Sequence, residues 1–200
     1  MANHRILIAF NSHEGKLYFF LPNGRVLAEG VGDTDIISVC IYADGNMAAV
    51  SRDGLIWTRN LVLAHNSVMP ESLAVPWIAM NVKSPSNAPW RQVALGSNGM
   101  VVALDTHGSI YRLVRTNTGQ ATTIYWGAIP SVDALGKHVF FTFISVGSID
   151  SSIWALDKGG NIWRFSHPLN SAKRIMSTTQ NSSSLNRSNS SSSGPPVHSM

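Results

Sequence analysis

The chain has 200 residues, enough for one domain with a sizeable core, and 44% of them are hydrophobic. Its single cysteine, Cys40, excludes an intrachain disulfide and favours a reducing compartment. The formal net charge of +4 arises after Asp157, where five basic and no acidic residues occur, so we expect no basic groove and no nucleic-acid partner.

A glycine motif recurs at a fixed spacing along the chain. In three copies two glycines lie nine residues apart, and in a fourth copy a serine replaces the first glycine. The pairs are Gly15 and Gly24, Gly45 and Gly54, Gly99 and Gly108, and Ser151 and Gly160. Repetition on this scale predicts an array of similar supersecondary units that stack on one another. We interpret such an array as favouring binding over catalysis.

Each unit is predicted to contain a strand, a glycine turn, a strand buried on both faces, a tight hairpin and a further strand. In chain order, the buried strands are residues 17–21, 47–50, 100–104 and 153–156. Short apolar runs bounded by turn residues favour this assignment. The hairpin turns that follow are residues 22–24, 52–54, 106–108 and 158–160, and the next strands are residues 25–27, 55–57, 109–111 and 161–163. Pro, Asn and Asp favour such turns, and Gly supplies the positive φ that closes a hairpin.

A fourth strand is predicted at residues 77–80 and 126–129, each of which begins with a tryptophan. Four antiparallel strands that are covered on both faces form a β-propeller blade. Hairpin glycines 54 and 52 residues apart agree with this length, whereas only 30 residues separate Gly24 from Gly54, which predicts a truncated first unit without room for a fourth strand. We therefore predict an all-β fold, a β-propeller of about three to four blades, with an incomplete ring as one alternative.

Glycines at the hairpin turns and tryptophans at equivalent strand positions are predicted to be the structural residues of the repeats. They are Gly24, Gly54, Gly108, Gly160, Trp57, Trp77, Trp126, Trp154 and Trp163. The repeats are expected to occupy residues 1–170. Residues 171–200 are expected to form a basic tail that is rich in Ser and Asn and disordered, because it has too little apolar surface to fold.

Two units resemble the tectonin repeat. Residues 144–147 (ISVG), 153–157 (IWALD) and 160–164 (GNIWR) match its successive strands, and residues 93–96, 101–105 and 108–112 match in the same order. The resemblance covers about residues 7–166 and implies a propeller of one of two kinds. One kind is secreted or surface lectins, and the other is cytoplasmic tectonin β-propeller repeat-containing proteins that act in autophagy and membrane trafficking.

The residues and this resemblance together predict a non-enzymatic binding or scaffold module of autophagy or vesicle trafficking. Its partners would be proteins or membrane-associated trafficking components, and its location the cytoplasm, at the periphery of autophagic or secretory membranes. The apolar run at residues 6–10 is too short for a signal peptide or a transmembrane segment. Two alternatives stay open: a lectin of the tectonin or tachylectin type that binds a glycan, and a fragment that only completes a larger propeller.

No catalytic residue, metal site or cofactor is predicted. None of the seven histidines pairs with another at metal-ligand spacing, and no nucleophilic serine motif occurs. Asp105 and Asp157 end buried strands, where they could face a ligand at the rim or, as we favour, cap their own hairpin turns. Ligand-binding residues are left unassigned, and we expect them in residues 60–76, 81–92 and 113–125, since function in repeat folds lies on variable loops.

Overall fold

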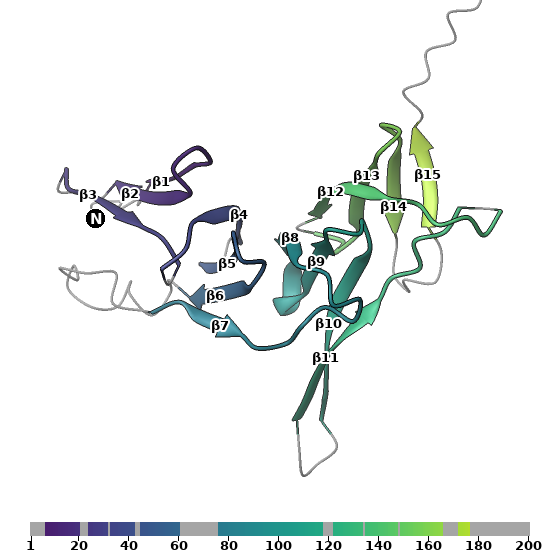
Figure 1. The fold of residues 1–200 in the computed structure, drawn as a ribbon, viewed down its shortest axis with the longest axis horizontal. Helices are drawn as coiled ribbons and strands as arrows, with labels where there is room; N and C mark the ends of the chain where they lie inside the picture. The colour runs from purple at the N-terminus through teal and green to yellow at the C-terminus, as the bar shows by residue number, and fades with distance from the viewer. Residues whose placement is uncertain are drawn as a thin grey trace, which may run out of the picture.

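The computed structural model describes residues 7–20, 24–31, 33–42, 45–60, 76–117, 122–133, 135–147, 149–165 and 172–176. These residues form four antiparallel sheets and no α-helix. The sheets follow one another around an open arc, which we describe as blades 1 to 4 (Figure 1). The predicted all-β architecture of propeller blades is therefore confirmed.

The blades contain three or four strands, hydrogen-bonded in chain order. Blade 1 consists of β1 (Leu7–Asn11), β2 (Lys16–Phe20) and β3 (Val26–Glu29). Blade 2 consists of β4 (Ile36–Ile41), β5 (Asn46–Ser51), β6 (Ile56–Asn60) and β7 (Ile78–Met80). Blade 3 consists of β8 (Trp90–Leu95), β9 (Val101–Asp105), β10 (Ile110–Asn117) and β11 (Thr122–Ala128). Blade 4 consists of β12 (Phe141–Val146), β13 (Ile153–Asp157), β14 (Ile162–Phe165) and β15 (Ala172–Met176).

The hydrophobic core is divided among the three junctions between neighbouring blades. Phe19 and Ile36 are central to the first junction, Trp90 to the second and Phe141 to the third. Among the described residues, no such cluster joins blade 4 to blade 1. Each inner blade is thus buried on both faces, as its continuous apolar strands predict, and the described residues cover only one face of each end blade.

Neighbouring blades are joined by the same backbone hydrogen bond at each junction. The N–H of the first residue of β4, β8 or β12 donates to a glycine carbonyl in a hairpin turn of the preceding blade. The pairs are Ile36 to Gly15 at 2.8 Å, Trp90 to Gly54 at 3.2 Å, and Phe141 to Gly108 at 3.0 Å. A Cβ on any of the three glycines would lie 2.4 to 2.7 Å from the residue that precedes the bonded strand, so only glycine allows this approach.

The same contact corrects the alignment of the first unit. Gly15, in the turn between β1 and β2, is the counterpart of Gly54 and Gly108. The strand register agrees, because Ala9 lies opposite Tyr18 just as Ala49 lies opposite Trp57. The described part of blade 1 therefore lacks the first strand of a blade, not the fourth. The prediction by spacing aligned Gly24 with Gly54, nine residues away from Gly15, the glycine that makes the equivalent contact.

The last strand lies beyond the expected end of the repeats. β15 covers Ala172–Met176, past the boundary set at residue 170, and pairs with β14 so that Ala172 faces Phe165. Residues 177–200, which hold most of the expected tail, lie outside the described residues. The division into repeats and tail stays a prediction, with Met176 as the last residue of the repeats.

Candidate functional site

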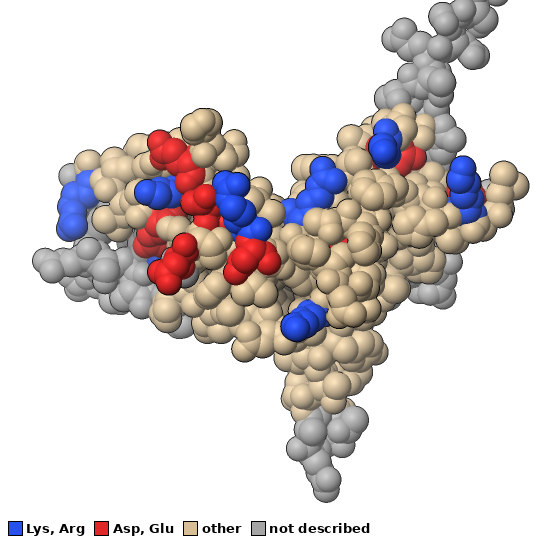
Figure 2. Space-filling model, in the orientation of Figure 1, with Lys and Arg blue, Asp and Glu red and all other residues tan. Residues whose placement is uncertain are grey.

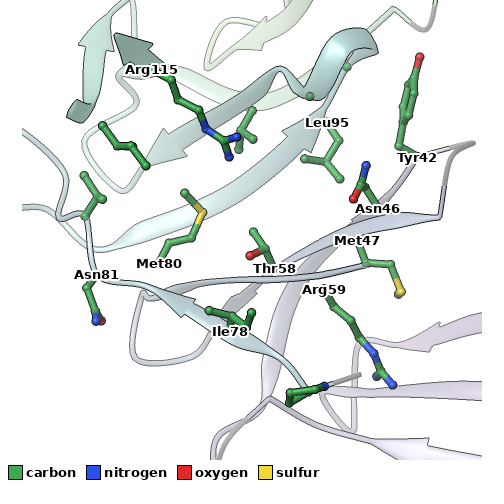
Figure 3. A pocket seen from close by; sticks show the side chains of 16 residues that line it. Tyr42, Asn46, Met47, Thr58, Arg59, Ile78, Met80, Asn81, Leu95 and Arg115 are labelled. Carbon is green, nitrogen blue, oxygen red and sulfur yellow. The ribbon is translucent and has the colours of Figure 1, made fainter. Parts of the chain in front are cut away.

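A groove of about 580 Å³ lies between blades 2 and 3. It is lined by the start of β5, by β6 and β7, by the turn between β8 and β9, and by the distal parts of β10 and β11. This volume lies in the range of sites that hold small molecules or a short peptide segment. Figure 3 shows side chains from both blades converging on the groove.

Most of the lining is apolar, with polar groups set around it. The apolar side chains are Met47, Pro76, Ile78, Met80, Val82, Leu95, Val101 and Ile124, and the polar ones are Tyr42, Asn46, Thr58, Arg59, Asn81 and Arg115. Ile78 is 63% exposed and Ile124 is 41% exposed, so the groove presents apolar side chains to solvent. The combination of an apolar surface and a few polar groups is typical of a recognition site.

A projecting hairpin forms one wall of the groove. β10 and β11 are longer than the other strands and extend from blade 3 as an arm (Figure 1). Arg115 and Ile124 face each other across this arm and both line the groove. The next residue, Tyr125, is 46% exposed. The arm therefore adds a cation and apolar surface beyond the packed part of blade 3.

A second, smaller pocket lies at the base of the same arm. Its volume is about 340 Å³, and it shares Gly99 and Arg115 with the groove. Arg112 also lines it, together with Ser97 and Ser151, whose hydroxyls hydrogen-bond to each other between blades 3 and 4. Arg115 thus borders both sites.

The arginines at these two sites differ in how they are paired. Arg59 forms an ion pair with Glu29, whereas Arg112 and Arg115 form none with the described residues, and no carboxylate lines either pocket. Acidic and basic side chains are mixed over blades 1 and 2, and a small basic area lies apart from them near the base of the arm (Figure 2). In Figure 3 the Arg115 side chain reaches toward the middle of the groove, so an anionic group bound there would find a charged donor.

None of the nine residues predicted as structural repeat positions lines either pocket. Gly24, Gly54, Gly108 and Gly160 all have positive φ, from 74° to 81°. Trp57, Trp126, Trp154 and Trp163 lie in β6, β11, β13 and β14, and Trp77 directly precedes β7. These positions shape the blades, and the groove takes its character from other residues.

The groove was not predicted, although all three of the proposed variable segments contribute to it, with Pro76 coming from residues 60–76. Asn81 and Val82 come from residues 81–92, and Arg115 and Ile124 come from residues 113–125. Residues 61–75, which hold most of the third segment, lie outside the described residues. No repeat position marks Arg115, because it lies in the part of β10 that extends beyond the equivalent strands β6 and β14.

Asp157 is buried at the end of β13, away from both pockets. Its carboxylate accepts hydrogen bonds from the Asn161 backbone at 2.8 Å, the Asn161 amide at 2.7 Å and the Trp163 indole at 2.8 Å. Asp105 caps its turn in the same way through the Ser109 backbone at 2.9 Å. Both contacts agree with the turn-capping interpretation of these two residues.

The buried Asp157 carboxylate should make stability depend on acid pH. Burial by itself would raise its pKa, but the hydrogen bonds from Asn161 and Trp163 hold the pKa below the ordinary 3.8. Its stabilisation is complete above pH 3.8 and is lost as the pH falls through the lower folded-state pKa. We expect Asp157→Asn to lose about 1.5 kcal/mol at neutral pH, in urea melts, and the difference from wild type to disappear in acid. A difference that stayed constant with pH would contradict this role.

Cys40 is the counterpart in blade 2 of a small residue inside the blade junction. Its sulfur accepts a hydrogen bond from the Leu95 backbone at 3.3 Å, and it packs against the apolar cluster between blades 2 and 3. Burial raises the pKa of the Cys40 thiol, and the bond from Leu95 offsets this only in part. A thiol held protonated is a poor nucleophile, which agrees with a packing role.

Comparison with known proteins gives matches in structure and none in sequence. No family model and no curated protein sequence matches the chain. Human WBSCR16, at 15% identity and a TM-score of 0.52, is matched over 88% of this chain and 54% of its own length. YCF48 from Cyanidioschyzon merolae, at 17% identity and a TM-score of 0.56, is matched over 85% and 55%. A streptogramin B lyase, at 15% identity and a TM-score of 0.56, is matched over 85% and 50%.

The chain has a β-propeller fold. It spans about half the length of the propellers that it matches. With its end faces uncovered in the described residues, it is an incomplete propeller. At these identities the likeness shows the fold alone.

The prediction that this chain is not an enzyme was inferred from its repeats, and that inference is wrong. Structures of the same fold include the streptogramin B lyase, virginiamycin B lyase from Staphylococcus aureus (11% identity, TM-score 0.52) and the dihydro-heme d1 dehydrogenase NirN (13% identity, TM-score 0.55). The virginiamycin B lyase is matched over 90% of this chain and 58% of its own, and NirN over 86% and 35%. A stack of blades supports catalysis as well as binding, because chemistry depends on the site and not on the fold.

The part of the propeller that the structure describes holds no cluster of three His, Cys, Asp or Glu side chains that could bind a metal ion. It also has no helix long and apolar enough to cross a membrane.

Proposed function

We propose that the chain is a β-propeller binding module that holds a segment of a partner protein in the groove between blades 2 and 3. The observation that carries this proposal is the largely apolar groove with Arg115 at its wall and no carboxylate in its lining. A peptide would bury apolar side chains on Met80 and Ile124 and present an acidic group to the guanidinium. Arginine binds carboxylates through two parallel hydrogen bonds, which would fix the position of the segment.

A propeller of similar fold supports this proposal. YCF48 has a structure bound to the D1 peptide, and that structure matches 80% of this chain at 13% identity with a TM-score of 0.51. The precedent concerns the fold, and the residues of the groove here supply the chemistry. The resemblance to tectonin repeats suggests partners from autophagy or vesicle trafficking, reached from the cytoplasmic side of the membranes concerned.

The lectin alternative has less support from the described residues. Stacking on a sugar ring needs an exposed aromatic face, and the exposed Tyr125 and Phe143 do not line the groove. Tyr111 and Trp163 are buried at blade junctions, and Trp154 is half-buried under Arg164, whose guanidinium lies 5.5 Å from its ring centre. The groove itself contains Tyr42 as its only aromatic residue. These observations favour a protein segment over a glycan as the ligand.

Selection from a displayed random-peptide library tests the proposal. We expect enrichment of peptides that combine large apolar residues with Asp or Glu. Arg115→Glu should weaken the best peptide at least tenfold, about 1.4 kcal/mol, because attraction becomes repulsion. Arg91→Glu makes the same charge change on an exposed residue outside both pockets and should leave the affinity unchanged.

Two results would count against the groove as the binding site. One is a library that yields no enriched peptide with the folded chain. The other is an enriched peptide whose affinity falls equally in the Arg115 and Arg91 variants, which would indicate a general effect of net charge.

A further inference from the structure

Each inner blade buries one face under the next blade by means of equivalent positions. In blade 2, Val50 faces Ile56 across the β5–β6 pair, and both side chains are at most 1% exposed. In blade 3, Leu104 and Ile110 form the same pair and are fully buried. We refer to this side of a blade as its outgoing face.

Blade 4 has the same outgoing face, but no further blade among the described residues covers it. Leu156 and Ile162 form the equivalent pair by register, and Phe143 lies opposite Leu156 on the neighbouring strand. Leu156 is 36% exposed, whereas its counterparts Val50 and Leu104 are fully buried under a following blade, and Phe143 is 53% exposed. The outgoing face of blade 4 is thus a largely apolar sheet surface that is exposed to solvent among the described residues.

Blade 1 has an exposed face on the opposite side, the side on which the later blades pack against the preceding blade. In blades 3 and 4 the positions that receive the preceding blade are Tyr111 with Leu113 and Trp163 with Phe165, all at most 8% exposed. Their counterparts in blade 1 are Tyr18 and Phe20.

Phe20 is 40% exposed, and its cross-strand neighbour Val26 is 51% exposed. Ala9 and Ala28 flank Tyr18 on the same face. This incoming face of blade 1 is largely apolar too, although no other blade among the described residues covers it.

Both faces are largely apolar. The incoming face of blade 1 presents Ala9, Tyr18, Phe20, Val26 and Ala28, and the exposed Lys16 lies on the same face at the first position of β2. The outgoing face of blade 4 carries Arg164, which is neutralised by Asp150 at 2.8 Å and stacks on Trp154, and the register places Lys173 of β15 opposite Arg164. Burial of the apolar residues would favour a contact between the two faces, with Lys16 and Lys173 as the charges that it has to accommodate.

We propose that a second copy of this chain covers both faces. The outgoing face of blade 4 in each copy packs against the incoming face of blade 1 in the other, so that two four-bladed arcs close into one ring. The ring would have eight blades, within the range of known propellers. This chain matches only about half of the length of each of three similar propellers, so a ring of that kind needs more blades than the four described here.

The two faces are different surfaces. A contact that joins unlike surfaces can produce either a closed ring or an open filament. Two copies related by a two-fold axis close it, with two identical junctions. The groove between blades 2 and 3 lies away from both junctions, so this inference does not depend on the proposed peptide site.

Solution mass of the full chain, measured by light scattering, tests the proposal. We expect twice the chain mass of 21.7 kDa. Phe20→Asp on the incoming face and Phe143→Asp on the outgoing face should each give the monomer mass. Leu135→Asp, at a 92% exposed loop position outside both faces, is the matched control and should leave the dimer intact.

Mixing the two variants makes the test specific. A Phe20→Asp chain keeps a normal blade 4, and a Phe143→Asp chain keeps a normal blade 1, so one normal junction can form between them. We expect the equimolar mixture to recover part of the dimer mass, while each variant alone stays monomeric. Circular dichroism melts of each variant confirm that the monomers are folded.

Several outcomes would overturn the proposal. A wild-type chain that is folded and monomeric would mean that other blades, or none, cover the two faces. A dimer that survives both substitutions would use another surface, and masses that grow with concentration would mean an open filament. A dimer lost in only one of the variants would mean that like faces pair with each other.

Discussion

Glu29→Ala is expected to destabilise the chain by about 3 kcal/mol, because it removes the carboxylate that faces a buried arginine. Arg59 has a side chain that is 1% exposed, and it forms an ion pair with Glu29 between blades 1 and 2. Its guanidinium also lies 5.7 Å from the ring centres of Phe19 and Trp77. Urea unfolding of the variant and of wild type measures the difference.

Arg59→Leu is the matched control from the other side of this ion pair. The counterparts of Arg59 in blades 3 and 4 are Leu113 and Phe165, so an apolar side chain fits the position. Glu29 remains partly open to water, with a side chain 26% exposed. We expect a cost of about 1 kcal/mol for Arg59→Leu, and little further loss when Glu29→Ala is added to it. Equal losses in both single variants would contradict the buried-charge argument.

Gly54→Ala is expected to cost about 3 kcal/mol, the sum of backbone strain and a steric clash. Gly54 has φ of +78°, and a Cβ there would lie 2.5 Å from the Pro89 side chain and 3.0 Å from its Cα. The clash would push blade 3 away at the point where the Trp90 N–H meets the Gly54 carbonyl. Thermal and urea melts of the full chain measure the loss.

Gly136→Ala separates the two contributions to that loss. Gly136 has φ of +74°, but a Cβ there would meet nothing within 4 Å. It should therefore cost only the strain, about 1 kcal/mol. Gly24→Ala should behave like Gly136→Ala if Gly15, and not Gly24, is the true counterpart of Gly54. A loss at Gly24 as large as that at Gly54 would restore the alignment by spacing.

The sequence predicted the blades well where each unit carries two different turns. In blades 2 to 4, apolar runs between a first glycine turn and a tight hairpin became the second strands of the sheets. The first unit was misaligned because its two turns, at Gly15 and Gly24, have the same spacing as the two turns of a complete blade. The residues after the turn held the correction: Gly15 is followed by Leu17 and Tyr18, as Gly54 is followed by Ile56 and Trp57.

The groove could not be predicted in the same way. Its walls come from strands that lie in different blades, such as Met47 in β5 and Arg115 in β10. Periodicity reports which face of a strand is covered, but it does not report how far neighbouring blades separate at their ends. The open faces at the two ends of the arc were equally hidden, since Leu156 and Leu104 follow the same local pattern although one is exposed and the other buried.

The backbone hydrogen bonds between blades have a consequence for how such a protein changes over evolutionary time. The joining atoms are main-chain nitrogens and glycine carbonyls, so substitution elsewhere leaves them in place. At the strand end before the hairpin, Asn11, Ser51, Asp105 and Asp157 are four versions of one polar position within a single chain. If repeats inside one molecule diverge this far, related molecules can diverge further and keep the same architecture. The relationship among the repeats is therefore kept in their backbone contacts and largely lost from their amino-acid sequence.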